Sequence, residues 1–143
     1  MQKQEGKMQQ DEAPRIAIVE DDEVLTFLLR EICRAAGHEV IWQTRNVTDA
    51  LLMLGEDEPD TLLFDFALDG RRDGIELLAA VRNEFPQMQT ILATGWDAER
   101  LASRIDYVAP DYLLQKPVMP ADLIGLLKRS AEAVHEAGLA CAA

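Results

Sequence analysis

Short apolar runs alternate along the chain with longer segments in which apolar residues recur every three or four positions. The short runs are typical of strands buried on both faces, and the longer pattern is typical of amphipathic helices. The predicted strands are residues 15–20, 38–42, 61–65, 89–93 and 111–115. The predicted helices are residues 24–36, 47–54, 74–84, 98–104 and 120–136.

This alternation of strands and helices predicts a doubly wound α/β domain built around a parallel sheet. Right-handed crossovers leave few topologies open, and we expect the flavodoxin-like strand order 2-1-3-4-5, numbered along the chain. We expect a flexible N-terminal tail over residues 1–14, a single domain over residues 15–136 and a C-terminal tail over residues 137–143.

The first predicted helix carries two apolar columns, each with a spacing of four residues, which is typical of an amphipathic helix. One column is Val24, Leu28 and Ile32, and the other is Leu25, Leu29 and Cys33. Asn46 and Asp73 are the predicted N-caps of the second and third helices. We interpret Asp22 only as a favourable negative charge at the start of the first helix.

Composition and charge exclude several kinds of partner. The chain has 26 acidic and 14 basic residues, and its formal net charge of −12 repels nucleic-acid phosphates and anionic membranes. No apolar run approaches the ~20 residues of a membrane span, and the polar N-terminus lacks the features of a signal peptide. We therefore expect a cytoplasmic protein that does not insert into membranes, with Cys33 and Cys141 as free thiols.

Charged side chains follow several of the predicted strands at their carboxyl ends, the edge where parallel sheets bind ligands. Glu20 and Asp21 follow the first strand, Asp65 ends the third, and Lys116 follows the fifth. Clustered carboxylates need a compensating cation, and all-oxygen ligands favour Mg²⁺.

After the fourth strand, Thr94 offers a hydroxyl donor, and Gly95 leaves room for a phosphate-sized group. Lys116 provides a positive charge for an anion. The combination predicts phosphoryl transfer onto the Asp65 carboxylate.

Five sequence motifs, taken in order, resemble the receiver (CheY-like) domain of bacterial two-component response regulators, of the stand-alone type. These motifs are Ile16-Ala17-Ile18-Val19-Glu20-Asp21-Asp22, Thr61-Leu62-Leu63-Phe64-Asp65, Asp73-Gly74, Ala93-Thr94-Gly95 and Lys116-Pro117. The resemblance implies that Asp65 is the phosphoacceptor and that Glu20, Asp21 and the backbone carbonyl of Ala67 bind Mg²⁺ together with it. It also implies that Thr94 and Lys116 bind the phosphoryl oxygens, with Gly95 beside them.

Two positions depart from the family pattern. Asp69 stands where the loop after the phosphoacceptor usually has a proline. Leu113 stands at the usual position of the switch aromatic, while Tyr112 is one residue earlier and should point to the opposite face of its strand. Trp96 is a further possible neighbour of the switch.

The expected function is that of a phosphorylatable signalling switch. A histidine kinase or a histidine phosphotransfer protein would supply the phosphoryl group, and the output would be binding to another protein or onward phosphotransfer. We expect no enzymatic activity beyond Mg²⁺-dependent self-phosphorylation and autodephosphorylation.

Three alternatives rank below this reading. One is a receiver that acts as a scaffold without phosphorylation. Another is a phosphatase with an aspartyl nucleophile, although Ala67 cannot supply the second acid that such enzymes usually carry. The third is a flavodoxin, in which the acidic residues after the first strand would repel the phosphate of FMN.

Overall fold

The computed structural model describes residues 12–68, 73–95 and 108–142. A parallel sheet of five strands has the order β2-β1-β3-β4-β5, which confirms the predicted topology. Its strands are β1 (Arg15–Val19), β2 (Glu39–Thr44), β3 (Thr61–Asp65), β4 (Gln89–Thr94) and β5 (Tyr112–Gln115). The helices of the described ranges are α2 (Glu23–Ala35), α3 (Val47–Glu56), α4 (Gly74–Glu84) and α6 (Pro120–Ala142).

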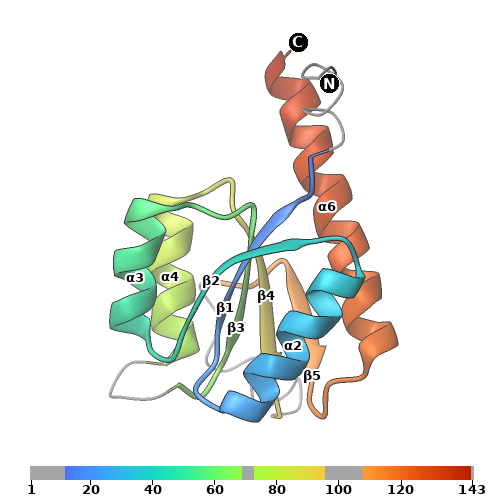
Figure 1. Cartoon of the computed structure of the whole chain (residues 1–143). Coiled ribbons are helices and arrows are strands. Elements are labelled where there is room, and N and C mark those ends of the chain that lie inside the picture. The colour runs from blue at the N-terminus through green and yellow to red at the C-terminus, as the bar shows by residue number, and fades with distance from the viewer. Residues whose placement is uncertain (1–11, 69–72, 96–107, 143) are drawn as a thin grey trace.

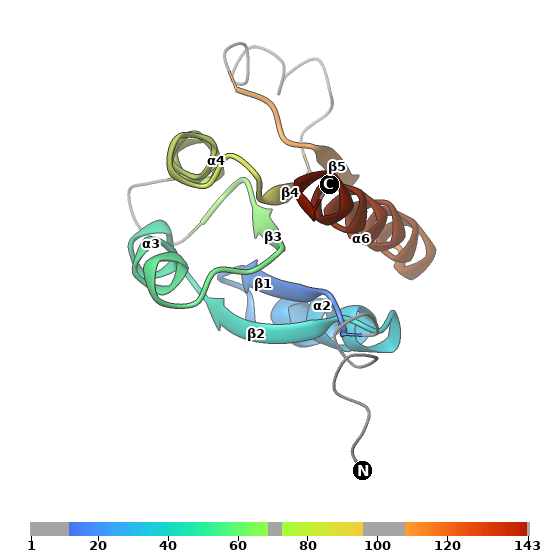
Figure 2. The same cartoon turned by 90° about the horizontal axis from the view of Figure 1, so that it is seen from above.

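Helices cover both faces of the sheet (Figures 1 and 2). The helices α3 and α4 lie on one face, and α2 and α6 lie on the other. Because β1 and β3 are central and covered on both sides, alternate residues of each strand enter different apolar cores. For example, Leu62 and Phe64 join the α3/α4 core, whereas Leu63 joins the α2/α6 core.

Side-chain caps begin three of the helices. The carboxylate of Asp22 accepts a hydrogen bond from the Leu25 N–H, and Asn46 and Asp73 cap α3 and α4 in the same way. The predictions for Asn46 and Asp73 are therefore confirmed. Asp22 does more than we predicted, because it satisfies a free backbone N–H of α2 as well as placing a charge there.

The first predicted helix is amphipathic as expected, but its apolar residues are not all buried. Leu29, Ile32 and Cys33 are buried, but Val24 is 80% exposed and Leu28 is 40% exposed. In the first turn of α2, the buried side chain that faces the sheet is the short side chain of Thr26. Val24 and Leu28 therefore point away from the sheet, whereas Ile32 of the same column lies in the α2/α6 core.

The last helix is longer than predicted, because α6 continues to Ala142 through the residues that we expected to form a C-terminal tail. Residues 137–142 are rich in alanine, the residue with the highest helix propensity, and contain no proline. Figure 1 shows α6 extending past the amino ends of the strands, away from the edge where Asp65 lies. Ala143, residues 1–11 of the expected N-terminal tail and the helix predicted at 98–104 lie outside the described residues.

Candidate functional site

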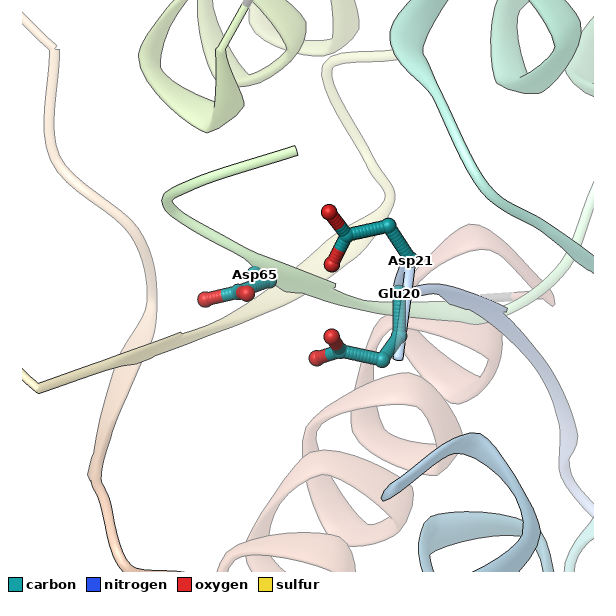
Figure 3. Close-up of side chains that lie close together, drawn as sticks. All are labelled: Glu20, Asp21 and Asp65. Atoms are coloured by element: carbon teal, nitrogen blue, oxygen red, sulfur yellow. The ribbon is translucent and has the colours of Figure 1, made fainter. Parts of the chain in front are cut away.

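Three carboxylates meet at the carboxyl ends of β1 and β3, which are neighbours in the sheet. Glu20 and Asp21 follow β1, and Asp65 is the last residue of β3 (Figure 3). One carboxylate oxygen from each residue lies within 4.8 Å of the others. Glu20 is 3% exposed and Asp65 is 6% exposed, so this cluster is largely shielded from water.

Lys116 reaches the cluster from the end of β5. Its Nζ lies 2.9 Å from Asp65 Oδ2 and 3.5 Å from Glu20 Oε1. The Lys116 N–H also donates to the Thr94 carbonyl at 2.8 Å, which ties the end of β5 to the end of β4. The four charged groups that the sequence predicted to meet are therefore brought together.

Burial and mutual repulsion perturb the acids of the cluster. Desolvation, followed by the charge of Asp65, raises the pKa of Glu20 to about 7. Desolvation also raises the pKa of Asp65, although the ammonium group of Lys116 opposes this shift. Burial alone would lower the pKa of Lys116, but the two carboxylates outweigh burial and raise it, so this side chain stays charged.

The donor set fits a divalent cation. Three carboxyl groups face one ammonium group, so full ionisation of the acids would leave two net negative charges at the cluster for a cation to balance. Glu20 Oε1 is buried and, within the described residues, its neighbour is the Lys116 ammonium group at the long distance of 3.5 Å, so this oxygen could also serve as a ligand. Oxygen ligands on short side chains suit Mg²⁺, which is usually held by one or two carboxylates and keeps several waters.

Gly74, at the start of α4, lies directly against the backbone of Asp65. The Gly74 N–H donates to the Phe66 carbonyl at 2.8 Å. A Cβ at this position would lie 2.4 Å from the Asp65 carbonyl oxygen, much closer than atoms can approach. Sequence reasoning recognised Asp73-Gly74 as the start of a helix, but it gave no sign of this contact.

The remaining predicted site residues are placed as follows. Thr94 is buried at the end of β4, where its backbone carbonyl accepts hydrogen bonds from both Gln115 and Lys116. Gly95 is exposed, and no heavy atom lies within 4 Å of where its Cβ would be. Ala67 is exposed two residues after Asp65.

The switch region is described only in part. Tyr112 packs against the α2/α6 core, whereas Leu113 is 37% exposed, so the two side chains point to opposite faces as predicted. Trp96 and the loop position Asp69 lie outside the described residues.

The class of the protein follows from the fold and from a family comparison. The sequence-family model of the response regulator receiver domain matches residues 16–128 of this chain. The chain therefore belongs to the response regulator receiver family, whose domains accept phosphoryl groups in two-component signalling. Such domains bind Mg²⁺ in an acidic pocket and interact with histidine kinases or phosphotransfer proteins.

Individual relatives agree with this class. The phosphate regulon transcriptional regulatory protein PhoB of Rhizobium meliloti (strain 1021) is 34% identical over 135 residues, covering 90% of this chain and 58% of the relative. The chain thus spans less than two thirds of that protein's length.

Among solved structures, the signal receiver domain of an HD domain-containing protein from Pseudomonas fluorescens Pf-5 has a TM-score of 0.78 at 26% identity, covering 87% of this chain and 98% of that one. A CheY-like receiver domain protein from Methanospirillum hungatei JF-1 has a TM-score of 0.76 at 27% identity, with the same coverage of 87% and 98%. In the part of the chain that the structure describes, no helix has the length and apolar character needed to cross a bilayer.

Proposed function

We propose that this protein is a cytoplasmic response regulator that acts as a single domain and accepts a phosphoryl group on Asp65. The observation that carries the proposal is the placement of a buried carboxylate at the end of β3, 2.9 Å from the ammonium of Lys116 and beside two further acids. A histidine kinase or a histidine phosphotransfer protein supplies the phosphoryl group.

In the transfer, an oxygen of Asp65 bonds to phosphorus as the bond from phosphorus to the donor imidazole nitrogen breaks. The electron pair of the broken bond stays with the imidazole. Lys116 and the Thr94 hydroxyl bind the phosphoryl oxygens, and Gly95 leaves space for the group beside them. These positioned charges stabilise the transition state, because catalysis of phosphoryl transfer is mostly positioning and electrostatics.

Glu20, Asp21, Asp65 and the backbone carbonyl of Ala67 are the proposed Mg²⁺ ligands. The bound ion supplies positive charge against the phosphoryl oxygens. The chain's own part is to present carboxylates that are already held together in the fold. Self-phosphorylation and autodephosphorylation are then the only reactions that the protein itself carries out.

The outer face of α2 supports a helical protein as the phosphoryl donor. Val24, Phe27 and Leu28 form an apolar ridge beside the acidic cluster, and Phe27 is 58% exposed. A hollow of about 350 Å³ on one side of the ridge reaches Glu20. A second hollow of about 330 Å³ on the other side is bounded by Lys116 and Pro117. A ridge between two grooves fits between two helices of a partner.

The signalling output follows from phosphorylation of Asp65. Phosphorylation adds roughly −1.5 to −2 charges next to Thr94. Leu113 has no hydroxyl group to bury or expose, so the usual movement of a polar switch aromatic is replaced by a change in the backbone after β4. The modified surface binds a downstream protein, or Asp65 passes the phosphoryl group on.

Labelling with a small phosphodonor tests the proposal without any partner protein. The full chain, incubated with Mg²⁺ and phosphoramidate, should gain the mass of one phosphoryl group in an acid-stable, base-labile linkage. Chelation of the metal should suppress the gain. An unchanged mass under conditions that label another receiver domain would contradict the proposal and favour a scaffold role.

A further inference from the structure

Thr26, in the first turn of α2, places its hydroxyl between two carbonyl groups of the turn that carries the acids, residues 20–22, and its single hydrogen is shared between them. Its Oγ1 lies 2.9 Å from the Asp22 carbonyl oxygen and 3.3 Å from the Glu20 carbonyl oxygen. The side chain is 8% exposed, so water does not compete freely for these carbonyls. The two bonded carbonyls belong to the residues on either side of Asp21.

Ordinary helix geometry accounts for only one of these bonds. Threonine in a helix often bonds the carbonyl four residues earlier, and this describes the contact with Asp22. The Asp22 carbonyl already accepts the Thr26 backbone N–H at 2.9 Å, so it is satisfied without the hydroxyl. The bond to Glu20 spans six residues and crosses from the helix to the end of β1.

Other bonds hold the same turn and leave Asp21 at its centre. The Glu20 N–H donates to the Thr44 carbonyl at 3.0 Å, and the Asp22 N–H donates to Glu20 Oε2 at 3.1 Å. Thr26 therefore completes a frame that fixes the backbone on both sides of Asp21. Since Asp21 is one of the proposed Mg²⁺ ligands, the position of its carboxylate depends on that frame.

We infer that Thr26 is a positioning residue of the metal site, which it serves by holding the backbone of residues 20–22. The inference rests on the proposed function, because it requires that the carboxylate cluster binds Mg²⁺. It assigns to the hydroxyl group a role in ligand geometry that goes beyond the stability of α2.

The test is isothermal titration of Mg²⁺ into the full chain, with two variants of Thr26. Thr26→Val keeps the shape and removes the shared hydroxyl donor, so the Mg²⁺ dissociation constant should rise about three- to tenfold, the effect of losing about one hydrogen bond. Thr26→Ser restores the hydroxyl and should bind within about twofold of wild type.

Thr61→Val is the matched control for a buried threonine. The Thr61 hydroxyl is bonded to Ser130 at the opposite end of β3 from Asp65, and Thr61 is 1% exposed. This variant should lower the unfolding midpoint without metal but leave Mg²⁺ affinity unchanged.

Equal Mg²⁺ affinity in wild type and Thr26→Val, or equally weak binding by Thr26→Ser, would overturn the inference and leave the proposed function standing. Loss of affinity in Thr61→Val to the same degree as in Thr26→Val would also overturn it, since affinity would then follow stability alone. A wild-type protein that binds no Mg²⁺ would overturn the inference and the proposed metal site together.

Discussion

At the scale of single residues, the site depends on keeping like charges close together. Two carboxylates about 4 Å apart repel by ~4 kcal/mol at an effective dielectric constant near 20. Lys116 offsets part of this repulsion through its contacts with Asp65 and Glu20. Burial, followed for Glu20 by the charge of Asp65, raises the pKa values of the two acids, which is why protons and Mg²⁺ should compete for the cluster.

The first prediction concerns the pH dependence of stability without metal. Folded Glu20, with a pKa of about 7, keeps a proton that the unfolded chain loses near 4.5. The folded state then binds more protons, so the contribution of Glu20 to the free energy of unfolding falls as pH rises through this window. Chemical denaturation of the metal-free protein at several pH values measures how the free energy of unfolding changes with pH.

The control for this prediction is Glu20→Gln, which removes the titrating group. Burial lowers the pKa of His38, which gives a slope of the opposite sign below 6.5, and this slope is common to both proteins. The difference between wild type and Glu20→Gln should therefore isolate Glu20. Parallel stability curves for the two proteins would contradict the raised pKa.

A second prediction concerns Gly74. Its replacement by alanine forces a Cβ against the Asp65 carbonyl oxygen, so the start of α4 and the acceptor strand must separate. Gly74→Ala should lower the free energy of unfolding by about 1–3 kcal/mol and slow labelling of Asp65.

Gly125→Ala, in α6, is the matched control, because no heavy atom lies within 4 Å of its added Cβ. This change should stabilise the protein by up to ~1 kcal/mol, since alanine favours helix over glycine. Urea unfolding and phosphodonor labelling compare the two variants. Equal stability and equal labelling would show that the close contact at Gly74 does not constrain Asp65.

Residues of the site divide into those that sequence could predict and those that it could not. Glu20, Asp21, Asp65 and Lys116 could be predicted to meet, because each follows a strand and parallel strands end at one edge. Thr26 and Gly74 act through close contacts with the backbone near the acids, and the amino-acid pattern carries no signal of such contacts.

At the scale of secondary-structure elements, α2 has two separate tasks. Its inner face packs Leu29 and Cys33 against the sheet, whereas its outer face leaves Val24, Phe27 and Leu28 in solvent. Exposed large apolar groups next to a reactive site indicate a docking surface. The spacing of apolar residues could not show this, because core contacts and partner contacts on one helix have the same period.

A third prediction follows for Phe27. Phe27→Asp should slow phosphotransfer from a histidine kinase that labels wild type by roughly 30-fold, the effect expected for loss of a central apolar contact. Labelling by phosphoramidate should not change, because Phe27 lies outside the acidic cluster.

Leu52→Asp on α3 is the control, because Leu52 is 64% exposed on a helix that covers the other face of the sheet. Initial rates of phosphotransfer measure the effect. Equal slowing by both substitutions, or no slowing by Phe27→Asp, would contradict docking on α2.

At the scale of the whole molecule, the proposed metal site would couple metal binding to folding through the paired ends of β1 and β3. The proposed ligands Glu20 and Asp21 are far in sequence from Asp65, and the two groups meet only in the folded sheet. Mg²⁺ at one hundred times its dissociation constant should therefore add roughly 2.7 kcal/mol to the free energy of unfolding. Melting curves with and without saturating Mg²⁺ test this fourth prediction.

Asp21→Asn should reduce the gain from Mg²⁺, since it removes one charged ligand. Ca²⁺ and Mg²⁺ should stabilise the folded protein to different extents, because Mg²⁺ is the smaller ion and demands stricter octahedral geometry. Identical midpoints for wild type with and without Mg²⁺ would count against the metal site.

The overall fold could be predicted well because its determinants are distributed along the chain. The alternation of buried strands and amphipathic helices, together with right-handed crossovers, leads to the order 2-1-3-4-5 that the sheet has. The end of α6 could not be placed in this way. Alanine-rich sequence has little apolar periodicity, so its helical propensity was the only available signal.

The central claim is that Asp65 is the phosphoacceptor, and labelling of Asp65→Asn tests it most directly. Asparagine keeps the shape of the side chain but is a far weaker nucleophile than a carboxylate. With Mg²⁺ and phosphoramidate, intact mass measurement should show one added phosphoryl group on wild type and none on the variant, while circular dichroism shows that both are folded. Full labelling of Asp65→Asn, with the phosphoryl group mapped to Glu20 or Asp21, would contradict the account.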